Sequence, residues 1–325
     1  MARRLTFQEA LVEAIRQEMV RDGRVFLVGQ DVGAMGGALQ STKGLLPAFG
    51  PERVWDAPIS EAAMAGITAG AALFGTRPIL DLSFGEFLPY IMPTIVNHAA
   101  LVHWGTAGRA RVPLLVRTKI GDGPYRGHPQ CYEAWLPHVP GLKVVMPSSA
   151  YDAKGLMLAG LRDGNIVLFL EHMYLYHSVR EEVPEEEYTV PIGTAKVVRE
   201  GRDVTAVATA WMVHKALAAA RELAREGIEL EVVDLRTLAP LDRETVLASV
   251  AKTGRLVVAH DAWRIGGFGG EVAAVVAEEG FHLLKAPIVR VGAPHVPLPV
   301  SLTLRKAMLP DARDVAGAAR KVLAR

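Results

Sequence analysis

Residues 59–73 of the chain have the sequence ISEAAMAGITAGAAL, and this stretch decides the fold class together with the segments on either side of it. Ser60 is suited to cap a helix that begins at Glu61 and runs to about Leu73. Alanine and glycine dominate this helix, and small side chains let two elements approach closely. The sequence therefore predicts a helix that packs deep in a domain, against a sheet or another helix.

Buried strands are predicted on both sides of this helix. Val25–Val28 precedes it and leads into a glycine-rich loop, Gly29–Gly37, and the strand 78–82 follows it. Other elements of the same half are a capped helix that begins at Thr6, strands at 114–120, 143–146 and 166–170, and helices at 87–103 and 151–162. Uninterrupted apolar strands that alternate with helices predict a parallel sheet covered on both faces.

The composition changes at residues 181–188, EEVPEEEY, which are acidic and lack an amphipathic period. We interpret them as an exposed linker, and the alternative is a solvated turn within one domain. Beyond them, strands are predicted at 204–209, 230–235, 256–260 and 288–291, and helices at 213–226, 243–251, 270–279 and 314–323. The prediction is an α/β chain with two doubly wound domains, 1–180 and 193–325, joined by a linker at 181–192.

The composition excludes several classes of protein. The 325 residues are 50% hydrophobic and carry a formal net charge of +1, so no basic excess is available to neutralise nucleic-acid phosphates. Cys131 is the single cysteine, which fits a reducing compartment, and we expect a small buried thiol there rather than a nucleophile paired with His138. No apolar run of membrane-spanning length and no secretory signal is evident, so a cytoplasmic location is expected.

Two glycine motifs were tested for nucleotide or cofactor binding. Gly266–Gly270 lacks the third glycine of the dinucleotide fingerprint and is interpreted as a glycine-rich helix entry. Gly121-Asp122-Gly123 begins like the magnesium and diphosphate motif of thiamine enzymes, but the next asparagine is Asn165, too far along the chain. We interpret it as a flexible loop, so the chain is not expected to hold a diphosphate by itself.

Seven segments follow one another in a characteristic order: 29–33 GQDVG, 57–63 APISEAA, 75–79 GTRPI, 140–145 PGLKVV, 152–156 DAKGL, 181–184 EEVP and 234–238 DLRTL. This ordered set resembles one known family, the beta subunits of pyruvate, branched-chain 2-oxo acid and acetoin dehydrogenases. The resemblance covers nearly the whole chain. It implies a transketolase-type pyrimidine-binding domain followed by a transketolase C-terminal domain, with thiamine diphosphate as the cofactor.

Glu61 is the central residue that the resemblance implies. In the family, the glutamate of this Ser-Glu pair hydrogen-bonds the aminopyrimidine ring and helps the cofactor to deprotonate its own thiazolium carbon, a form of general acid–base catalysis. The residues alone favour a simpler interpretation, in which Glu61 complements the helix dipole.

The resemblance implies roles for further residues. Phe87 matches the aromatic side chain that stacks on the pyrimidine, and His128 matches the histidine of a mobile loop that acts on the substrate. The other expected cofactor contacts are Gln30, Ile59, Ser60 and Ser83, the other expected substrate contacts are Phe84 and Glu86, and the expected potassium ligands are Leu114, Gly160, Leu161, Asp163 and Asn165.

Three positions depart from the family pattern. Gln30 replaces a glutamate of the first loop, Pro93 replaces an acidic residue after Phe87, and Pro129 follows His128 in place of a serine. Both acids are thought to relay protons between paired sites in relatives, so that communication is in doubt here. Pro129 also removes a backbone donor and stiffens its loop.

The predicted function is that of a beta subunit that works with a separate alpha subunit in a two-alpha, two-beta assembly. The pair would decarboxylate a 2-oxo acid oxidatively and pass the acyl group to a lipoyl group on an acyltransferase core, with magnesium held by the alpha subunit. Alternatives are an acetoin dehydrogenase beta subunit and a catalytically altered scaffold. A stand-alone nicotinamide oxidoreductase is disfavoured by the incomplete glycine fingerprint.

Overall fold

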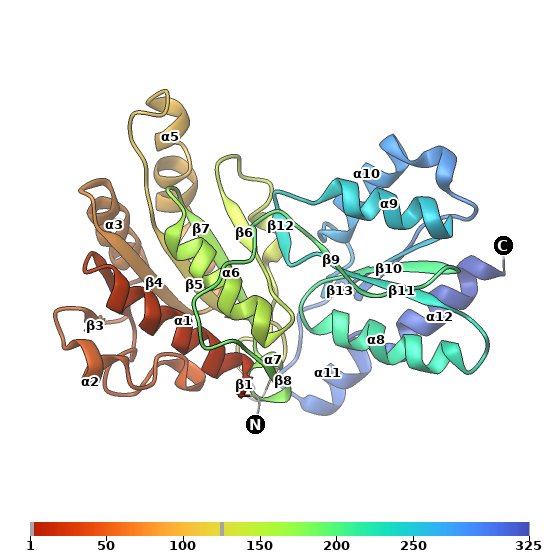
Figure 1. Ribbon diagram of the computed structural model, residues 1–325, viewed down its shortest axis with the longest axis horizontal. Helices are drawn as coiled ribbons and strands as arrows, with labels where there is room; N and C mark the ends of the chain where they lie inside the picture. The colour runs from red at the N-terminus through yellow and green to blue at the C-terminus, as the bar shows by residue number, and fades with distance from the viewer. Residues whose placement is uncertain (1–2, 124–126, 325) are drawn as a thin grey trace. The chain divides into compact units, whose positions relative to one another are not determined.

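The computed structural model describes residues 3–123 and 127–324. The chain forms two compact units, the first comprising Met1–Ile120 and Trp135–Ile192 and the second Gly121–Ala134 and Gly193–Arg325. Both have the predicted α/β architecture, and Figure 1 shows a sheet flanked by helices in each. No helix within the described residues is both long and apolar enough to span a membrane.

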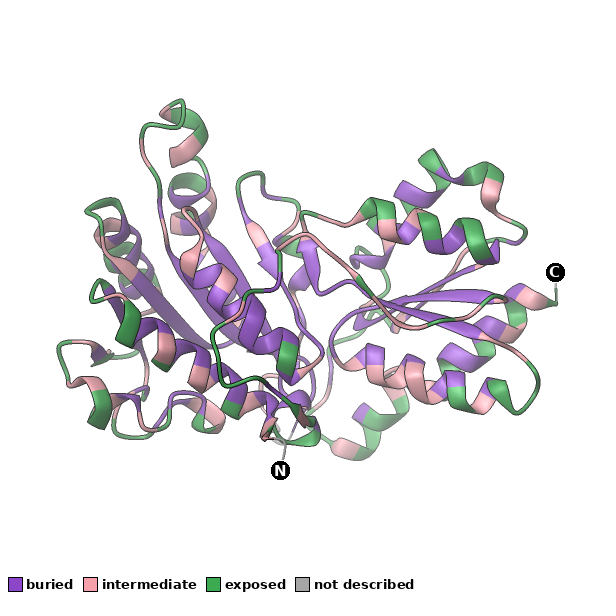
Figure 2. Cartoon of the chain, viewed as in Figure 1, coloured by how far each residue is buried: buried purple, intermediate pink, exposed green. Residues whose placement is uncertain are grey.

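A parallel sheet forms the centre of the first unit. Its strands lie in the order β6-β7-β5-β4-β2-β3, and each neighbouring pair is parallel. The strands are β2 Val25–Gly29, β3 Val54–Asp56, β4 Arg77–Phe84, β5 Leu115–Ile120, β6 Lys143–Val145 and β7 Val167–His172. Strands β2, β5 and β7 are buried along their whole length, as expected for strands covered on both faces (Figure 2).

The helices of this unit are α1 Phe7–Arg21, α2 Leu45–Phe49, α3 Glu61–Leu73, α4 Leu88–Thr94, α5 Val102–Gly105, α6 Ala150–Arg162 and α7 Leu175–Ser178. Helices α1, α3, α4 and α6 begin near the predicted residues, whereas α2 and α7 were not predicted. Short turns of 3-10 helix lie at Ala38–Gln40, Gly85–Phe87 and Glu133–Trp135. Thr6 and Glu9 form the expected capping box of α1.

The helix predicted over 87–103 is interrupted. A π-helical turn, Ile95–Ala99, separates α4 from α5. Pro93 lies inside α4, where it cannot donate the usual backbone hydrogen bond. An interrupted hydrogen-bond ladder of this kind often includes a π-helical turn.

The predicted linker is exposed at most positions but is held by the first unit. Residues Arg180–Glu182 form strand β8, antiparallel to β1 Arg4–Thr6. The buried ammonium of Lys154 donates to the carbonyls of Pro184, Glu185 and Glu186, at 2.6, 3.1 and 3.0 Å. These carbonyl contacts give the acidic segment a fixed path.

The second unit has a five-stranded sheet in the order β14-β13-β10-β11-β9, parallel except for β9. The strands of this sheet are β9 Lys196–Arg199, β10 Val204–Ala208, β11 Leu230–Asp234, β13 Leu256–Trp263 and β14 Val289–Ala293, and a further short strand, β12 Thr237–Ala239, is not part of it. The helices of the unit are α8 Trp211–Ala224, α9 Arg243–Thr253, α10 Gly269–Glu279, α11 Leu302–Met308 and α12 Ala312–Leu323, with a 3-10 turn at Phe281–Leu283. Valine and alanine from β10, β11, β13, α8 and α12 fill the core between them.

Candidate active site

Glu61 is the first residue of α3, and its side chain is partly exposed. The Nε2 of Gln30, directly after β2, donates a hydrogen bond to Glu61 Oε1 over 3.3 Å. Ser60 occupies the N-cap position, but its hydroxyl makes no capping bond, contrary to expectation. Its ψ of 72° differs from the extended values of 163° and 158° at the capping residues Thr6 and Ser149.

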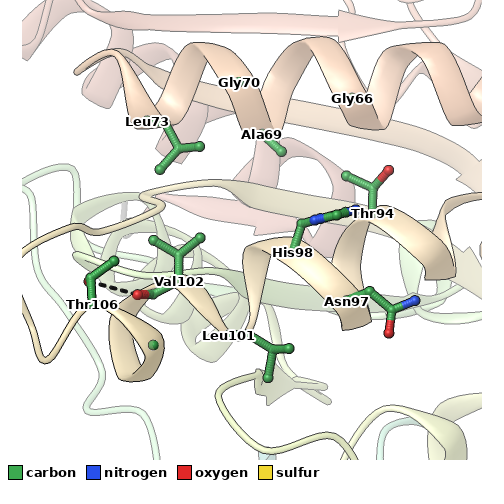
Figure 3. A pocket seen from close by; sticks show the side chains of 11 residues that line it. Gly66, Ala69, Gly70, Leu73, Thr94, Asn97, His98, Leu101, Val102 and Thr106 are labelled. Atoms are coloured by element: carbon green, nitrogen blue, oxygen red, sulfur yellow. Dashed lines mark hydrogen bonds between the residues drawn. The ribbon is translucent and has the colours of Figure 1, made fainter.

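The prediction that α3 lies deep holds for one face only. Met64, Ala65 and Thr68 are buried, whereas a Cβ added at Gly66 or Gly70 would meet no atom within 4 Å. A pocket of about 450 Å³ lies along this open side, between α3 and α4–α5. Figure 3 shows its lining, which comprises Gly66, Ala69, Gly70, Leu73, Thr94, Asn97, His98, Leu101, Val102, Gly105 and Thr106. One side of the helix that carries Glu61 is thus left uncovered by this chain.

The end of β4 and the turn that follows it carry four of the predicted contacts. Ser83 has a φ of +58°, a conformation uncommon for residues other than glycine, and its N–H donates to Asp81 Oδ1 over 2.9 Å. The rings of Phe84 and Phe87 meet edge to face with centroids 6.4 Å apart, and Phe87 and Glu86 are partly exposed. Because Gly29 pairs with Asp81, this turn and Gln30 follow the carboxyl ends of adjacent parallel strands. The structure therefore brings Gln30, Glu61 and the β4 turn to one edge of the sheet.

A buried ionic network supports this edge, and the sequence reasoning missed it. Lys119 Nζ lies 2.7 and 2.9 Å from the two carboxylate oxygens of Asp81. Arg117 binds Glu171 through two hydrogen bonds of 2.6 and 2.7 Å and donates to the carbonyl of Ser41 over 3.0 Å. The sequence did contain a signal for this network. Arg117 and Lys119 are charged residues at alternate positions of an otherwise apolar strand, and such positions share one face of the sheet.

The cations of this network stabilise the Asp81 carboxylate, whereas at Lys119 burial outweighs the pairing and lowers the pKa of the ammonium. Burial opposes ionisation of Asp81, but Lys119 and Arg117 outweigh it and hold the pKa of that carboxyl below its usual value. Asp81 also accepts the bond from Ser83, so the network fixes the turn that presents Phe84 and Phe87. The loop after β2 is tied in through Ser41.

His128 belongs to the segment Gly121–Ala134, which is grouped by its contacts with the second unit. It is partly exposed and has a φ of +46°. Asp122 is not in an open, flexible loop as expected, because it is buried and paired with Arg305. Residues 124–126 of the predicted mobile loop lie outside the described residues.

Hydrogen-bond donors already take the oxygens expected to bind potassium. Arg77 donates to the carbonyls of Leu161, at 3.0 and 2.6 Å, and Asp163, at 2.7 Å. Lys143 pairs with the Asp163 carboxylate, and the carbonyls of Leu114 and Gly160 accept backbone bonds from Val167 and Asp163. Among the described atoms of this set, Asn165 Oδ1 is buried without a hydrogen bond, but potassium needs several oxygens to replace its water. The positive charges of Arg77 and Lys143 beside these oxygens oppose the binding of a potassium ion.

Other reactive groups give no second site. Cys131 is buried, and burial raises the pKa of its thiol well above the usual value, which opposes a nucleophilic role. Within residues 3–123 and 127–324, no group of three or more His, Cys, Asp or Glu side chains is placed to hold a metal ion.

Comparisons with known proteins match the whole length of the chain. The transketolase pyrimidine binding domain matches residues 3–178, and the transketolase C-terminal domain matches residues 193–315. The chain is 41% identical to the pyruvate dehydrogenase E1 component subunit beta of Bacillus subtilis, with 98% of each chain covered. It is 44% identical to the acetoin:2,6-dichlorophenolindophenol oxidoreductase subunit beta of Cupriavidus necator, with 99% of this chain and 98% of the relative covered.

Two further comparisons agree with these matches. The 2-oxoisovalerate dehydrogenase subunit beta of Bacillus subtilis is 40% identical, with 98% of each chain covered. A solved structure described as a split-gene transketolase, inactive beta4 tetramer, superimposes with a TM-score of 0.81 at 27% identity and 98% coverage of both chains. The chain therefore belongs to the family of dehydrogenase E1 component beta subunits, with transketolase pyrimidine-binding and C-terminal domains.

Proposed function

We propose that this chain supplies the pyrimidine-binding half of a thiamine diphosphate site and that a separate alpha subunit supplies the other half. The observation that carries the proposal is the Gln30–Glu61 hydrogen bond at the start of α3, on the same sheet edge as Phe87. A carboxylate and a partly exposed aromatic ring suit an aminopyrimidine, which offers both hydrogen-bond donors and a flat apolar face. When bound, the cofactor supplies a nucleophilic carbon that adds to a 2-oxo acid and takes up electrons as carbon dioxide leaves.

The residues of this chain hold the ring and move protons around it. Glu61 would bind the aminopyrimidine and hold a proton at its carboxylate, while the Gln30 amide keeps that carboxylate oriented. Phe87 would pack on the ring, with Ile59, Ser60 and Ser83 as further cofactor contacts. His128, with Phe84 and Glu86, would contact the substrate.

A partner subunit is supported by apolar side chains left exposed just before α3, just after α3 and on α5. Ile59 is 82% exposed, and Phe74 and Trp104 are 93% and 89% exposed. Large apolar patches on a folded chain mark protein interfaces. The expected assembly has two alpha and two beta chains, the alpha chain holds magnesium and the diphosphate, and a cytoplasmic lipoyl acyltransferase core accepts the acyl group.

The substrate is proposed to be pyruvate or a branched-chain 2-oxo acid. Relatives named for pyruvate, 2-oxoisovalerate and acetoin have similar identities, at 41%, 40% and 44%, so acetoin is the second candidate. Turnover of pyruvate, 2-oxoisovalerate and acetoin by the assembled pair decides between them.

Calorimetry tests the division of the site between two chains. Thiamine diphosphate with magnesium is titrated into the beta chain alone, the alpha chain alone and the assembled pair. Tight binding is expected only for the pair. Equally tight, magnesium-dependent binding by the beta chain alone would contradict the proposal.

A further inference from the structure

The segment Gly121–Ala134 follows strand β5 of the first unit in sequence but is grouped by its contacts with the second unit. This segment carries His128, which is proposed to contact the substrate. The contacts at its two ends therefore bear on how that histidine is presented.

The first end is held by a buried ion pair. Asp122 is 4% exposed, and its carboxylate pairs with the guanidinium of Arg305, which is fully buried on α11. The same guanidinium donates to the carbonyls of Pro299 and Val300, at 2.9 and 3.3 Å. Arg305 thus joins the start of the segment to the chain that leads into α11, and a buried charge on either side depends on the other.

The second end of the segment makes a further set of contacts. The side-chain amide of Gln130 donates to the Leu298 carbonyl over 3.4 Å and accepts from the Leu298 N–H over 3.5 Å. The rings of Tyr132 and Trp263 lie 5.7 Å apart. Gln130 therefore binds Leu298, which directly precedes Pro299 and Val300, and the carbonyls of those two residues accept hydrogen bonds from Arg305.

Glu133 makes the last contact at this end of the segment. It is 1% exposed, and its Oε1 lies 3.9 Å from Nδ1 of the buried His260. The imidazole sits against glycine backbone, since a Cβ at Gly267 would lie 2.4 Å from its Cε1 and one at Gly269 would lie 2.8 Å from its Cδ2. This close packing leaves the His260 ring little freedom to move.

We propose that Arg305 is a positioning residue, which fixes the segment that presents His128 by holding Asp122. The C-terminal domain then sets the geometry of the segment that carries His128. The inference rests on the role of His128 in the proposed function. Arg305 itself contacts neither substrate nor cofactor.

The test uses the assembled alpha–beta complex and four variants. Arg305→Met removes the guanidinium that holds Asp122. Arg305→Lys keeps the positive charge but loses the planar set of donors that reaches Asp122 and the two carbonyls. Lys306→Met, at the exposed neighbouring position on α11, is the matched control. His128→Ala removes the residue that Arg305 is proposed to position.

Misplaced catalytic groups reduce rate more than affinity. Arg305→Met is expected to lower kcat by about tenfold to a hundredfold with an unchanged Kd for thiamine diphosphate. Arg305→Lys should recover part of that loss, and Lys306→Met should match the parent. Amide hydrogen exchange in peptides covering 121–134 should accelerate in Arg305→Met and not in the control.

A double variant separates positioning from general damage. In the His128→Ala background, Arg305→Met should cause no further loss of kcat, because both changes remove one function. A multiplicative loss, or unchanged exchange across 121–134, would overturn the inference. If Arg305→Met fails to assemble, Asp122→Asn removes the same charge contact from the other side and carries the same expectations.

The role of His128 in the proposed function and the hold of Arg305 on the segment can be tested separately. Full turnover by His128→Ala would refute the role of that histidine and, with it, the positioning role of Arg305. Exchange in the 121–134 peptides needs no turnover, so it would still decide whether Arg305 holds the segment.

Discussion

Gln30 donates a hydrogen bond from its side-chain amide to the carboxylate of Glu61 over 3.3 Å. The two residues are 31 positions apart in sequence, and they meet because β2 ends beside the start of α3. An amide is neutral at every working pH, so it orients the carboxylate without competing for its proton. This contact gives the departure from the family pattern at Gln30 a structural meaning.

Replacing Gln30 with glutamate should change the pH dependence of the reaction. Gln30→Glu would set two carboxylates side by side, and such a pair holds one proton more tightly than an isolated carboxyl does. If turnover needs Glu61 ionised, the acidic limb of the kcat profile should move to higher pH. Measurements of kcat across the acidic range check this. If the acidic limb of the profile does not move, the residue at position 30 does not influence Glu61 during turnover.

The stability of the second unit should depend on pH through Glu133 and His260. Burial raises the pKa of Glu133 from 4.5 to about 8, with Asp261 contributing. Burial, with Arg290 contributing, lowers the pKa of His260 from 6.5 to about 4. From pH 4.5 to 6.5 the two effects oppose, since folding favours the proton on Glu133 and disfavours it on His260.

Above pH 6.5, Glu133 is the member of this pair that still makes the free energy of unfolding depend on pH. The folded state keeps a proton that the unfolded state releases, so the free energy of unfolding should fall up to about pH 8. The decrease should be roughly 2 kcal/mol over this window. Denaturant titrations of Glu133→Gln should show a flatter profile than the parent, while Glu278→Gln, an exposed control, should keep the parental slope.

Arg77 should make the first unit indifferent to potassium. Its guanidinium already satisfies the carbonyls of Leu161 and Asp163. The Tm of the parent should be equal in potassium and choline chloride, and Arg77→Met should lower it, because buried carbonyls lose their donors. Stabilisation of the parent by potassium beyond that by choline would show that the ion binds despite Arg77. Arg24→Met, at an exposed arginine paired with Asp22, is the matched control.

Sequence periodicity located most elements, because buried parallel strands and amphipathic helices leave strong local signals. It also placed Glu61 at the start of a helix. The sequence could mark a buried charge, as at Arg117 and Lys119, but left no local signal of which distant residue it pairs with. The Asp122–Arg305 pair joins residues 183 positions apart, so a glycine-rich stretch could be interpreted only as a loop. Likewise, the Leu161 and Asp163 carbonyls that were expected to bind potassium accept hydrogen bonds from Arg77, which lies on the distant strand β4.

Turnover by Glu61→Gln in the assembled complex tests the central claim most directly. Glutamine keeps the size of the side chain but cannot take part in acid–base chemistry, so kcat should fall by about 10²- to 10⁴-fold without loss of folding. Glu52→Gln, at an exposed position, should keep parental activity. Parental turnover by the Glu61 variant would show that this carboxylate does not serve the cofactor.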